Sequence, residues 1–452
     1  MPSEITSILQ LFLRHRQVTT DSRSVREGDI FFALRGDRFD GNTFAQSAID
    51  QGASLVVVDN PQVFNQLKAK ELKATMQQEE AGQFKVLVED ALISLQDLAT
   101  AYRRSWQIPV FAITGSNGKT TTKELITAVM SMRYQTHATQ GNYNNHIGVP
   151  LTILSTPEDA EICILEMGAN HQKEIADLCR IAEPTHGLIT NIGQAHLEGF
   201  GGREGIKKGK GEMFDWLGKS HGIGFVNLDQ KEVVELGAKL HQGIEFGHSD
   251  APSLAVKTIE VGLLRSHPNC RVVFLDEHGE HFTADTQLPG KHNFENIKAA
   301  VAVGKYFKVP GHAIASALEN YRSENARSQR LQHRGVNFFW DAYNANPTSV
   351  KAALDAFALL EQKPKAAILG EMLELGEESE DLHKELARYA QQLDIEQLLL
   401  VGDAYKKVST ELGLPFFSNS QLLKDWFWEQ DWEAHLIFVK GSRAVALEAL
   451  IK

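Results

Sequence analysis

A short glycine loop between residues 115 and 120 carries the residue types that bind phosphate. The loop and the start of the segment after it comprise Gly115, Ser116, Asn117, Gly118, Lys119, Thr120 and Thr121, directly after the apolar run VFAIT. Backbone N–H groups in such a turn, and the N-terminus of a following helix, attract anions. Lys119 can then reach terminal phosphates, and the Thr120 hydroxyl can ligate Mg²⁺. A plain strand-to-helix junction also favours Gly, Asn and Thr, but it leaves Lys119 unexplained, so we predict a nucleotide site.

Two later apolar runs lead into side chains that could complete a metal site. Glu166 ends the run EICILE, and open parallel sheets bind ligands at the carboxyl ends of their strands. Its oxygens suit Mg²⁺ held beside phosphates, although a carboxylate there could equally cap the next helix. His196 lies in the glycine-rich stretch TNIGQAHLEGFG, and a single loop histidine is usually solvated. The metal interpretation therefore depends on both residues together.

A lysine and two asparagines further along the chain each have a plain and a functional interpretation. Lys210 stands in IKKGKGEMF, which reads plainly as a solvated basic stretch that opens a helix. Asn293 and Asn296, in PGKHNFENIKAAVAV, are three residues apart and share one face of a predicted helix. Their amides could form paired hydrogen bonds with a ligand, or they could form the polar start of a helix.

Two motifs near the C-terminus place polar side chains after apolar strands. In DAYNANPTSV, Asp341 ends a strand and Asn346 precedes Pro347, as a helix cap precedes a first-turn proline. In VKGSR, Lys440 and Arg443 follow the last apolar strand. These two cations could contact a phosphate or a substrate carboxylate, or they could be solvated loop charges.

The elements that must position these residues form three predicted α/β units. Residues 1–86 form a small unit of short strands with a polar helical tract over 63–80. Residues 87–321 alternate continuous apolar strands with helices, which indicates a parallel, doubly wound sheet. Within this unit, a hairpin is expected to turn on Gly279. Residues 322–452 restart the strand–helix alternation and predict a Rossmann-like unit.

The composition limits the class of protein. A chain of 452 residues favours two or three domains. The 46 basic and 58 acidic residues leave a net charge of −12, which disfavours a nucleic-acid duplex as the main partner. The three cysteines lack metal-ligand spacing and are expected to be reduced. The N-terminal apolar run is short and has no basic flank, and no segment approaches the ~20 apolar residues of a membrane span. We therefore expect a cytoplasmic protein.

Together these motifs resemble those of the Mur ligases, which form amide bonds in peptidoglycan precursors. TGSNGKTT, ILEMGANH, TNIGQAHLEGFG and KGKGEMF resemble the central ATPase domain, and TTDSRSVREGDIFFALRG resembles a UDP-binding start. PGKHNFENIKAAVAV resembles the adenine-binding segment, which implies that the Asn293 and Asn296 amides pair with the N6/N7 edge of adenine. The resemblance implies an N-terminal α/β UDP-binding domain, a central P-loop ATPase domain with a parallel sheet, and a Rossmann-like C-terminal domain. It also implies ATP, two Mg²⁺ ions and a carbamylated lysine at Lys210. The implied metal ligands are Thr120, Glu166, His196 and Lys210.

The ends of the chain resemble the family member that joins D-alanyl-D-alanine to UDP-N-acetylmuramoyl-tripeptide. GNYNNHIGVPLTIL, DAYNANPTSV, GEMLELG and VKGSR carry this similarity. It implies an ATP-dependent ligase that acts through an acyl phosphate, as a monomer on small molecules, without nucleic acid or stable membrane insertion. The implied catalytic residues are Lys119, Lys210, Glu166 and His196. The implied nucleotide residues are the loop residues with His292, Asn293, Asn296, Arg327, Asp341 and Tyr343. The implied substrate residues are Ser22, Arg23, Asn142, Asn144, Asn145, Asn346, Lys440 and Arg443.

The chain departs from the family pattern at a few positions. Asn42 stands where the family has a histidine after Asp-Gly, Glu371 where it has an aspartate before Met, and NARSQRLQ where Pro-Gly-Arg is usual. The stretch DNPQ at Asp59 is predicted to be a turn, because the similar motif of the diaminopimelate-adding enzyme lies in the C-terminal domain and contains an arginine.

Two other functions stay open from the sequence. One is a different ligase or kinase with this loop, such as a folylpolyglutamate synthetase, which would lack the UDP-binding start. The other is a nucleotide-binding regulatory or scaffold protein, which should lack Glu166, His196 or Lys210. All of these features are present. Whether the tripeptide ends in diaminopimelate or lysine is undetermined.

Overall fold

The computed structural model describes residues 3–36, 39–72, 82–252, 257–324 and 326–452. The chain divides into two compact units. The first unit contains Met1–Ala112, Gln135–Gly168 and Glu174–His186, and the second contains Ile113–Tyr134, Ala169–Lys173 and Gly187–Lys452. In the described ranges, every helix is too short or too polar to serve as a membrane-spanning segment.

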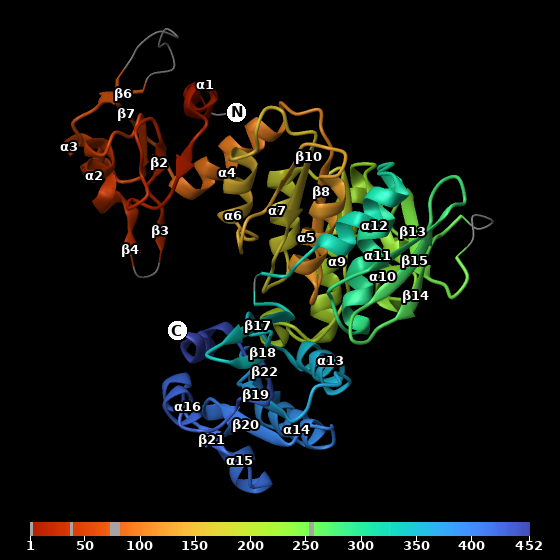
Figure 1. Ribbon diagram of the computed structural model, residues 1–452. Helices are drawn as coiled ribbons and strands as arrows, with labels where there is room; N and C mark the ends of the chain where they lie inside the picture. Colours follow the sequence, from red (N-terminus) through yellow and green to blue (C-terminus); the bar gives the residue numbers. More distant parts are fainter. Residues whose placement is uncertain (1–2, 37–38, 73–81, 253–256, 325) are drawn as a thin grey trace. The chain divides into compact units, whose positions relative to one another are not determined.

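The N-terminal part of the first unit is built on a parallel five-stranded sheet of order β1-β2-β5-β7-β6 (Figure 1). Its elements are α1 (Ser3–His15), β1 (Val18–Thr19), β2 (Ile30–Phe32), β3 (Arg35–Gly36), β4 (Phe39–Asp40), η1 (Gly41–Phe44), α2 (Ala45–Asp50), β5 (Leu55–Val58), α3 (Pro61–Gln66), β6 (Lys70–Glu71), β7 (Phe84–Leu87) and α4 (Ala91–Arg103). Every residue of β2 and β5 is buried, as expected for central strands made of β-branched and aromatic residues.

Two local predictions in this region were wrong. The helix predicted over 63–80 ends at Gln66, and Lys70–Glu71 instead pair with β7 as the edge strand β6. The part of that prediction at 73–80 lies outside the described residues. The turn predicted at Asp59 is a helix start: the Asn60 side chain accepts the N–H groups of the first turn of α3, and Pro61 follows it.

The central part of the chain contains a nine-stranded sheet of order β16-β15-β14-β13-β12-β11-β8-β10-β9. Its elements are β8 (Val110–Thr114), α5 (Lys119–Met130), β9 (Thr136–Ala138), α6 (Gly148–Leu154), β10 (Ile162–Glu166), α7 (Glu174–Ala182), β11 (His186–Ile189), α8 (Leu197–Phe200), α9 (Arg203–Lys219), β12 (Ile223–Asn227), α10 (Lys231–Gly237), β13 (Gln242–His248), β14 (Ile259–Arg265), β15 (Arg271–Leu275), β16 (His281–Asp285), α11 (Lys291–Tyr306) and α12 (Gly311–Asn320). Strands β9 and β10 belong to the first unit, β12 to β16 belong to the second, and β8 has residues of both.

The central sheet is parallel at β9–β10 and from β12 to β14, in agreement with the predicted sheet type, and the predicted hairpin is the antiparallel pair β15–β16. Gly279 has a φ of +83° between these two strands, a conformation that glycine adopts without steric cost. Strands β13 and β14 were not predicted, because about half of their residues are exposed and they show no continuous apolar run.

The C-terminal part folds around a six-stranded sheet of order β17-β18-β22-β19-β20-β21. Its elements are β17 (Gln329–His333), β18 (Val336–Trp340), α13 (Pro347–Ala358), β19 (Lys365–Gly370), η2 (Gly376–Glu378), α14 (Ser379–Gln391), β20 (Gln397–Val401), η3 (Asp403–Tyr405), α15 (Lys406–Leu412), β21 (Phe416–Phe417), α16 (Ser420–Phe427), β22 (Leu436–Lys440), η4 (Arg443–Val445) and η5 (Leu447–Ile451). All strand pairs are parallel except β17–β18.

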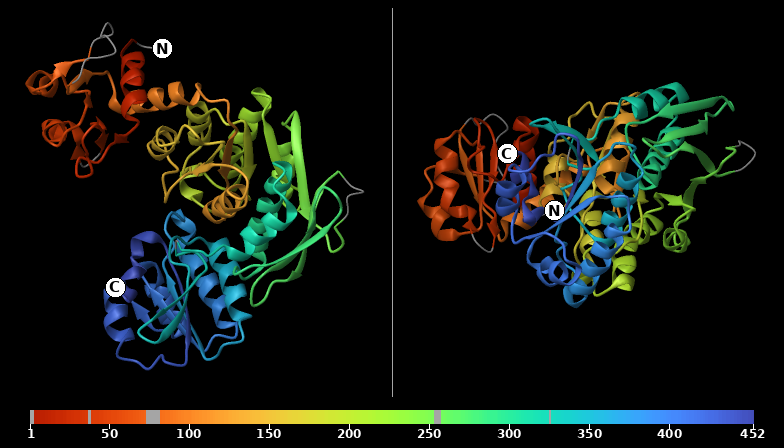
Figure 2. Two further views of the ribbon diagram at one scale, coloured as in Figure 1. Left: turned by 45° about the horizontal axis from the view of Figure 1, so that its top comes forward. Right: turned by 60° about the horizontal axis from the view of Figure 1, so that its bottom comes forward.

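Successive side chains of these strands enter two separate cores. Phe339 and Phe438 pack in one core with residues of α13 and α14, while Phe338 and Ile437 pack in the other with Phe427 of α16. Helices therefore cover both faces of the sheet, as the blue segment of Figure 2 shows. The Rossmann-like fold predicted for this part is confirmed, with an additional antiparallel edge strand.

Two glycines contact each other where neighbouring strands of this sheet end: Gly370 is the last residue of β19, and Gly441 follows β22. A Cβ atom on Gly370 would lie 3.0 Å from the Cα of Gly441, and a Cβ on Gly441 would lie 2.8 Å from the Cα of Gly370. A side chain at either position would therefore require the two backbones to move apart.

Candidate active site

The glycine loop of the second unit has the conformation that a phosphate loop needs. Gly115 has a φ of +141°, and Gly118, which precedes α5, has a φ of +79°. A Cβ atom on Gly115 would lie 2.0 Å from Oγ1 of Thr190, and one on Gly118 would lie 2.4 Å from Oδ1 of Asn296. Both backbone strain and close neighbours therefore require glycine at these positions.

The end of β11 holds this loop in place. Asn191 accepts the Asn117 N–H at Oδ1 (3.1 Å) and donates from Nδ2 to the Asn117 carbonyl (2.9 Å). The Thr190 hydroxyl donates to the same carbonyl at 2.7 Å. Ser116 adds a bond from its hydroxyl to the Gly193 carbonyl and accepts the Gly193 N–H in return. Sequence reasoning missed Thr190 and Asn191, although this polar pair follows an apolar strand and precedes a glycine.

Lys119 and Thr120 lie at the start of α5, where the helix dipole favours anions. The Lys119 ammonium donates to the carbonyls of Gly115 (2.7 Å) and Ser116 (3.1 Å), so it folds over the loop. Thr120 is buried in the first turn. The sequence prediction of strand, glycine turn, lysine and helix start is confirmed as an arrangement, and the phosphate it would bind stays a prediction.

The two asparagines of α11 lie on one buried helical face, as predicted. Asn293 donates to the Pro289 carbonyl at 2.9 Å, and Asn296 donates to Oδ1 of Asn293 at 3.2 Å. The Asn296 amide oxygen also accepts the Thr122 hydroxyl at 3.0 Å. Asn296 therefore supports the phosphate loop from behind, since its oxygen stands where a Gly118 side chain would be. Contact of either amide with adenine stays a prediction.

Lys210 is buried, with 1% of its surface exposed, so the plain interpretation as a solvated charge was wrong for this residue. Its ammonium donates to the Ala169 carbonyl at 3.0 Å and lies 4.8 Å from the centre of the Phe200 ring. Lys207, one turn earlier in α9, does behave as a surface charge and pairs with Glu235. The helical period separates the two lysines onto different faces of α9.

His196 precedes α8 and is paired with a carboxylate from the C-terminal part of the second unit. Its Nδ1 bonds to Oε2 of Glu374. Both residues have a left-handed backbone, with φ of +58° for His196 and +62° for Glu374. The alternative of a merely solvated histidine was therefore wrong. Sequence reasoning missed Glu374, although this residue lies in the GEMLELG motif that resembles the family pattern.

Glu166, in the first unit, is a buried carboxylate that is only partly satisfied. Its Oε1 accepts Nδ2 of Asn144 at 2.8 Å, and its backbone N–H donates to the Thr139 hydroxyl at 3.0 Å. Its Oε2 is buried without a hydrogen-bond partner, and an orphaned buried oxygen of this kind is costly without a cation. The helix-cap alternative was wrong, because α7 begins only at Glu174. A buried carboxylate oxygen of this kind suits Mg²⁺.

No three His, Cys, Asp or Glu side chains of the described residues gather into a metal-binding group. A metal bound by the predicted residues would therefore need oxygens from other sources. The Thr120 hydroxyl, nucleotide phosphates and water are such sources.

The predicted substrate residues of the N-terminal region are exposed or stabilise turns. Arg23 forms a bidentate ion pair with Asp21, and this bond lowers the pKa of Asp21 to about 2. Ser22 lies between them. Asn145 accepts the N–H groups of Ile147 and Gly148 before α6. Asn142 is exposed.

Asn42, where the family has histidine, is buried between two carboxylates. Its Nδ2 donates to Oδ1 of Asp40 (2.7 Å) and to Oδ1 of Asp59 (2.8 Å). Asp59 also pairs with Arg35 at 2.8 Å. The neutral Asn42 amide thus joins the two acids through one nitrogen.

A second cluster, of predicted nucleotide and substrate residues, lies at the ends of β18 and β22. Lys440 is 4% exposed and pairs with Asp341 at 2.6 Å, so the solvated alternative was wrong for this lysine. Arg443, by contrast, has an exposed side chain that pairs with Glu448. Burial lowers the pKa of the nearby His292 to about 4, with Asp341 and Lys440 acting in opposite directions.

Arg327 lies against an aromatic ring beside this pair. Its guanidinium is 3.9 Å from the centre of the Tyr343 ring, and that of Arg443 is 5.8 Å from the same ring. The Arg327 Nε is buried without a hydrogen-bond partner. An unpaired donor on a stacked arginine suits a polar, anionic ligand.

Asn346 connects this cluster to the phosphate loop. It caps α13 in a capping box with Ser349, and Pro347 follows, as the sequence predicted. Its Nδ2 also donates to Oδ1 of Asn117 at 2.7 Å. Within the second unit, Asn346 therefore links the C-terminal cluster to the phosphate loop, and Glu374 links the C-terminal part to His196.

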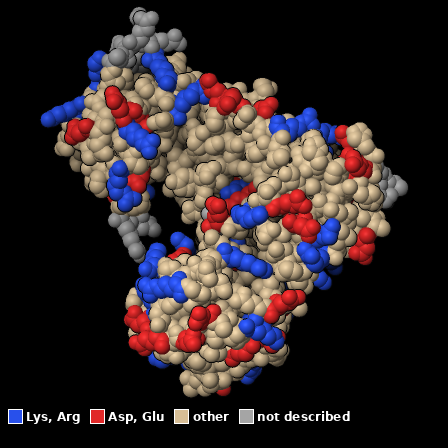
Figure 3. All heavy atoms as spheres, in the orientation of Figure 1, with Lys and Arg blue, Asp and Glu red and all other residues tan. Residues whose placement is uncertain are grey.

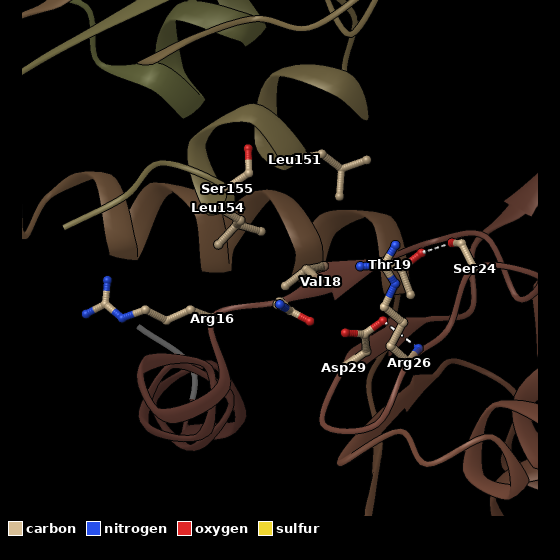
Figure 4. Close-up of a pocket in the computed structure, with 10 residues that line it drawn as sticks. Arg16, Val18, Thr19, Ser24, Arg26, Asp29, Leu151, Leu154 and Ser155 are labelled. Carbon is tan, nitrogen blue, oxygen red and sulfur yellow. Dashed lines mark hydrogen bonds between the residues drawn. The ribbon is translucent and has the colours of Figure 1, made fainter. Parts of the chain in front are cut away.

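A separate pocket of about 300 Å³ lies in the first unit between the β1 region and α6 (Figure 4). Arg16, Arg26 and Asp29 line one part of it, and Leu151 and Leu154 line another. None of the predicted site residues lines this pocket.

Three family models match consecutive parts of the chain. Residues 15–103 match the Mur ligase family catalytic domain, residues 113–304 the Mur ligase middle domain, and residues 326–435 the Mur ligase glutamate ligase domain. The chain is 34% identical to the UDP-N-acetylmuramoyl-tripeptide–D-alanyl-D-alanine ligase of Bacillus subtilis, with 96% of this chain and 92% of that protein covered. The enzyme of that name from Escherichia coli is 32% identical over the same shares.

Solved structures give the same relationship. A MurF structure from Acinetobacter baumannii superimposes with a TM-score of 0.79 at 28% identity, over 98% of this chain and 96% of that one. A Thermotoga maritima MurF ligase in complex with ADP gives a TM-score of 0.78 at 26% identity over the same shares. Escherichia coli FolC, at 14% identity and a TM-score of 0.60, shares only the fold.

Proposed function

Because this chain belongs to the Mur ligase family, we propose that it joins D-alanyl-D-alanine to UDP-N-acetylmuramoyl-tripeptide, using ATP. The observation that carries the proposal is identity of 34% along nearly the whole chain to an enzyme with this name. All three family domains are matched in order. The product would be the UDP-linked pentapeptide of peptidoglycan synthesis. We further propose that the reaction takes place in the cytoplasm, where ATP and UDP-linked precursors are made, and that the protein acts as a monomer.

The first step would transfer the γ-phosphoryl group of ATP to the terminal carboxylate of the tripeptide. A carboxylate oxygen forms the new P–O bond, the bond to the β-phosphate oxygen breaks, and ADP leaves. Lys119 folds over the loop carbonyls, so its charge lies where a transferring phosphoryl group would collect negative charge. Asn191 and Thr190 keep the loop N–H groups in position during this transfer.

The second step would form the amide. The amine of D-alanyl-D-alanine attacks the acyl carbon, phosphate leaves, and the amine releases a proton. The phosphate groups and the carboxylate of D-alanyl-D-alanine are all anionic and must meet in one site. The buried Lys440, together with Arg327 and Arg443, offers cations for them. Arg23 and Ser22 lie in the UDP-binding segment, and Asn346 contacts the phosphate loop through Asn117.

We assign Mg²⁺ to the predicted set because its residues suit that ion. Bound Mg²⁺ would neutralise charge on the phosphate oxygens. Glu166 offers a buried oxygen without a partner, and His196 has its Nδ1 fixed by Glu374, which leaves Nε2 for a ligand. Thr120 lies at the first turn of α5.

The further assignment of Lys210 as a carbamate rests on its burial. A lysine with 1% exposure and a carbonyl acceptor loses its proton more readily than one in water. Addition of CO₂ to the neutral amine would turn it into an anionic oxygen donor. Ala169, which accepts the Lys210 bond, follows Glu166 by three residues in the chain.

ADP release with defined substrates tests the proposal. We expect turnover only when ATP, a UDP-N-acetylmuramoyl-tripeptide and D-alanyl-D-alanine are all present, and parallel assays with diaminopimelate and lysine tripeptides would identify the preferred form. Full turnover with the UDP-dipeptide and a diamino acid, or with a folate and glutamate, and none with D-alanyl-D-alanine, would contradict it.

A further inference from the structure

His196 receives its orientation from a residue of a different domain. Its Nδ1 bonds to the Glu374 carboxylate, which lies in the loop between β19 and η2. An ionised carboxylate can only accept hydrogen bonds, so Nδ1 must carry the proton. The lone pair of a neutral imidazole then stands on Nε2, and that nitrogen is the one free to ligate a metal.

Three successive residues just before Glu374 are hydrogen-bonded to other parts of the C-terminal domain. These bonds fix the loop that carries the contact with His196. The Met372 N–H donates to Nε2 of His383 at 2.8 Å, and the Leu373 N–H donates to the Ser442 hydroxyl at 3.0 Å. One residue earlier, Oε2 of Glu371 accepts the Ala404 N–H at 3.0 Å. The partners lie in three segments of the C-terminal domain: α14, η3 and the loop that follows β22. These three segments together determine where Glu374 lies.

His383 is well suited to this task. It is fully buried, and its Nδ1 bonds to the Ser379 carbonyl at 2.6 Å. A carbonyl accepts and a backbone N–H donates, so His383 has its proton on Nδ1 and its lone pair on Nε2. Its ring also packs edge-on against Tyr405, with the ring centres 4.6 Å apart.

Backbone strain at both His196 and Glu374 indicates that their contact has a functional role. His196 and Glu374 are both non-glycine residues in the left-handed region, each at a cost of about 1–2 kcal/mol. Such strain persists where surrounding contacts determine the conformation, and it concentrates at functional sites.

We infer that Glu374 is a positioning residue: the C-terminal domain supplies the carboxylate that fixes the tautomer and direction of His196 for metal binding. The inference rests on the metal role of His196 in the proposed function. It adds that the metal site of the central domain is complete only when the Glu374 loop contacts His196. The metal affinity of the enzyme should therefore depend on whether this loop is docked.

Mn²⁺ binding in the presence of ADP tests this, with Glu374→Ala, Glu374→Gln and the control Glu377→Gln, an exposed carboxylate of the same segment. We expect Glu374→Ala to weaken Mn²⁺ binding by about tenfold or more and to reduce the nitrogen coupling of the Mn²⁺ spin-echo signal that His196→Ala removes. Glu374→Gln should retain most of the affinity, because its amide oxygen still accepts from Nδ1. Glu377→Gln, the ADP affinity and the thermal midpoint should not change.

Two results would overturn the inference. One is wild-type Mn²⁺ affinity and coupling in Glu374→Ala. The other is an equal loss in the Ala and Gln variants together with a lower thermal midpoint, which would show a structural role alone. Ligation by the wild-type enzyme is measured separately, so a wrong substrate assignment would be recognised by its own assay.

Discussion

At the residue scale, the site depends on supporting side chains as much as on the residues that meet the ligand. Asn191 bonds the Asn117 backbone on both sides, and Thr190 adds a third bond. Each such bond stabilises the loop by about 1 kcal/mol. The loop conformation that presents its N–H groups is therefore not a property of the glycine sequence alone.

Replacing Asn191 by Ala should loosen the phosphate loop without unfolding the protein. Two of its bonds to Asn117 disappear, so we expect the KM for ATP to rise by about tenfold, in line with the loss of one to two hydrogen bonds. Steady-state kinetics would measure this, with Gln194→Ala in the same loop as the control. An unchanged KM would show that Thr190 and Ser116 hold the loop by themselves.

Replacing Lys210 by Ala should abolish ligation while nucleotide binding at Lys119 and Thr120 survives. Since we assign an anionic oxygen donor to Lys210, small carboxylic acids such as formate or acetate should restore part of the activity. Calorimetric ADP binding and the ligation assay separate the two effects. Lys207→Ala, which loses only a surface pair with Glu235, is the control. A fully active Lys210→Ala enzyme would contradict the assignment.

At the element scale, strand ends decide where the charged groups lie. Lys440 ends β22 and Asp341 follows β18, and the parallel pairing of these two strands brings the two side chains together. The pair is buried, and Oδ1 of Asp341 also accepts the Ser328 N–H, which fixes the backbone just before β17. Its structural contribution therefore accompanies any role toward the nucleotide.

Lys440→Ala should lower the free energy of unfolding by about 3 kcal/mol, since it leaves a buried carboxylate without its partner. Chemical denaturation would measure the loss. Arg443→Ala, an exposed arginine of the same motif, should change stability by no more than about 0.5 kcal/mol. Equal stability of both variants would indicate that the lysine acts on ligands alone.

The sequence predicted the elements with continuous apolar runs and the strand-end motifs attached to them. It placed Lys119, Glu166, Asn346 and the β15–β16 hairpin where the structure has them. It could not show that Lys210 is buried, because burial of a lysine depends on Phe200 and Ala169, which the fold brings to it. Half-exposed strands such as β13 and the contact of His196 with Glu374 likewise arise only from tertiary structure.

At the scale of the whole molecule, the chain is moderately acidic, with a net charge of −12. Acidic and basic side chains are interspersed on the face shown in Figure 3. Both observations agree with a protein whose anionic ligands are small and bound locally.

Folding stability should fall in mild acid because several histidines are buried. Burial lowers the pKa of His186 to about 4 and also lowers that of His383, whereas an unfolded histidine titrates near 6.5. Below pH 6.5 these histidines bind protons in the unfolded chain but stay neutral in the folded one. Their contribution to the free energy of unfolding is therefore fully present above pH 6.5 and declines toward pH 4. Thermal midpoints across this range measure the decline. His186→Gln should flatten the curve, and an unchanged slope would contradict the contribution of this residue.

The touching glycines at the ends of β19 and β22 have a consequence for how this gene can vary. An added Cβ atom would lie 3.0 Å from the opposite Cα at Gly370 and 2.8 Å from it at Gly441, and a substitution at the other glycine cannot relieve the contact because glycine has no side-chain atom to remove. Substitution of either codon, or of both together, should therefore be disfavoured. A library randomised at both positions should return, among its folded members, the original pair alone.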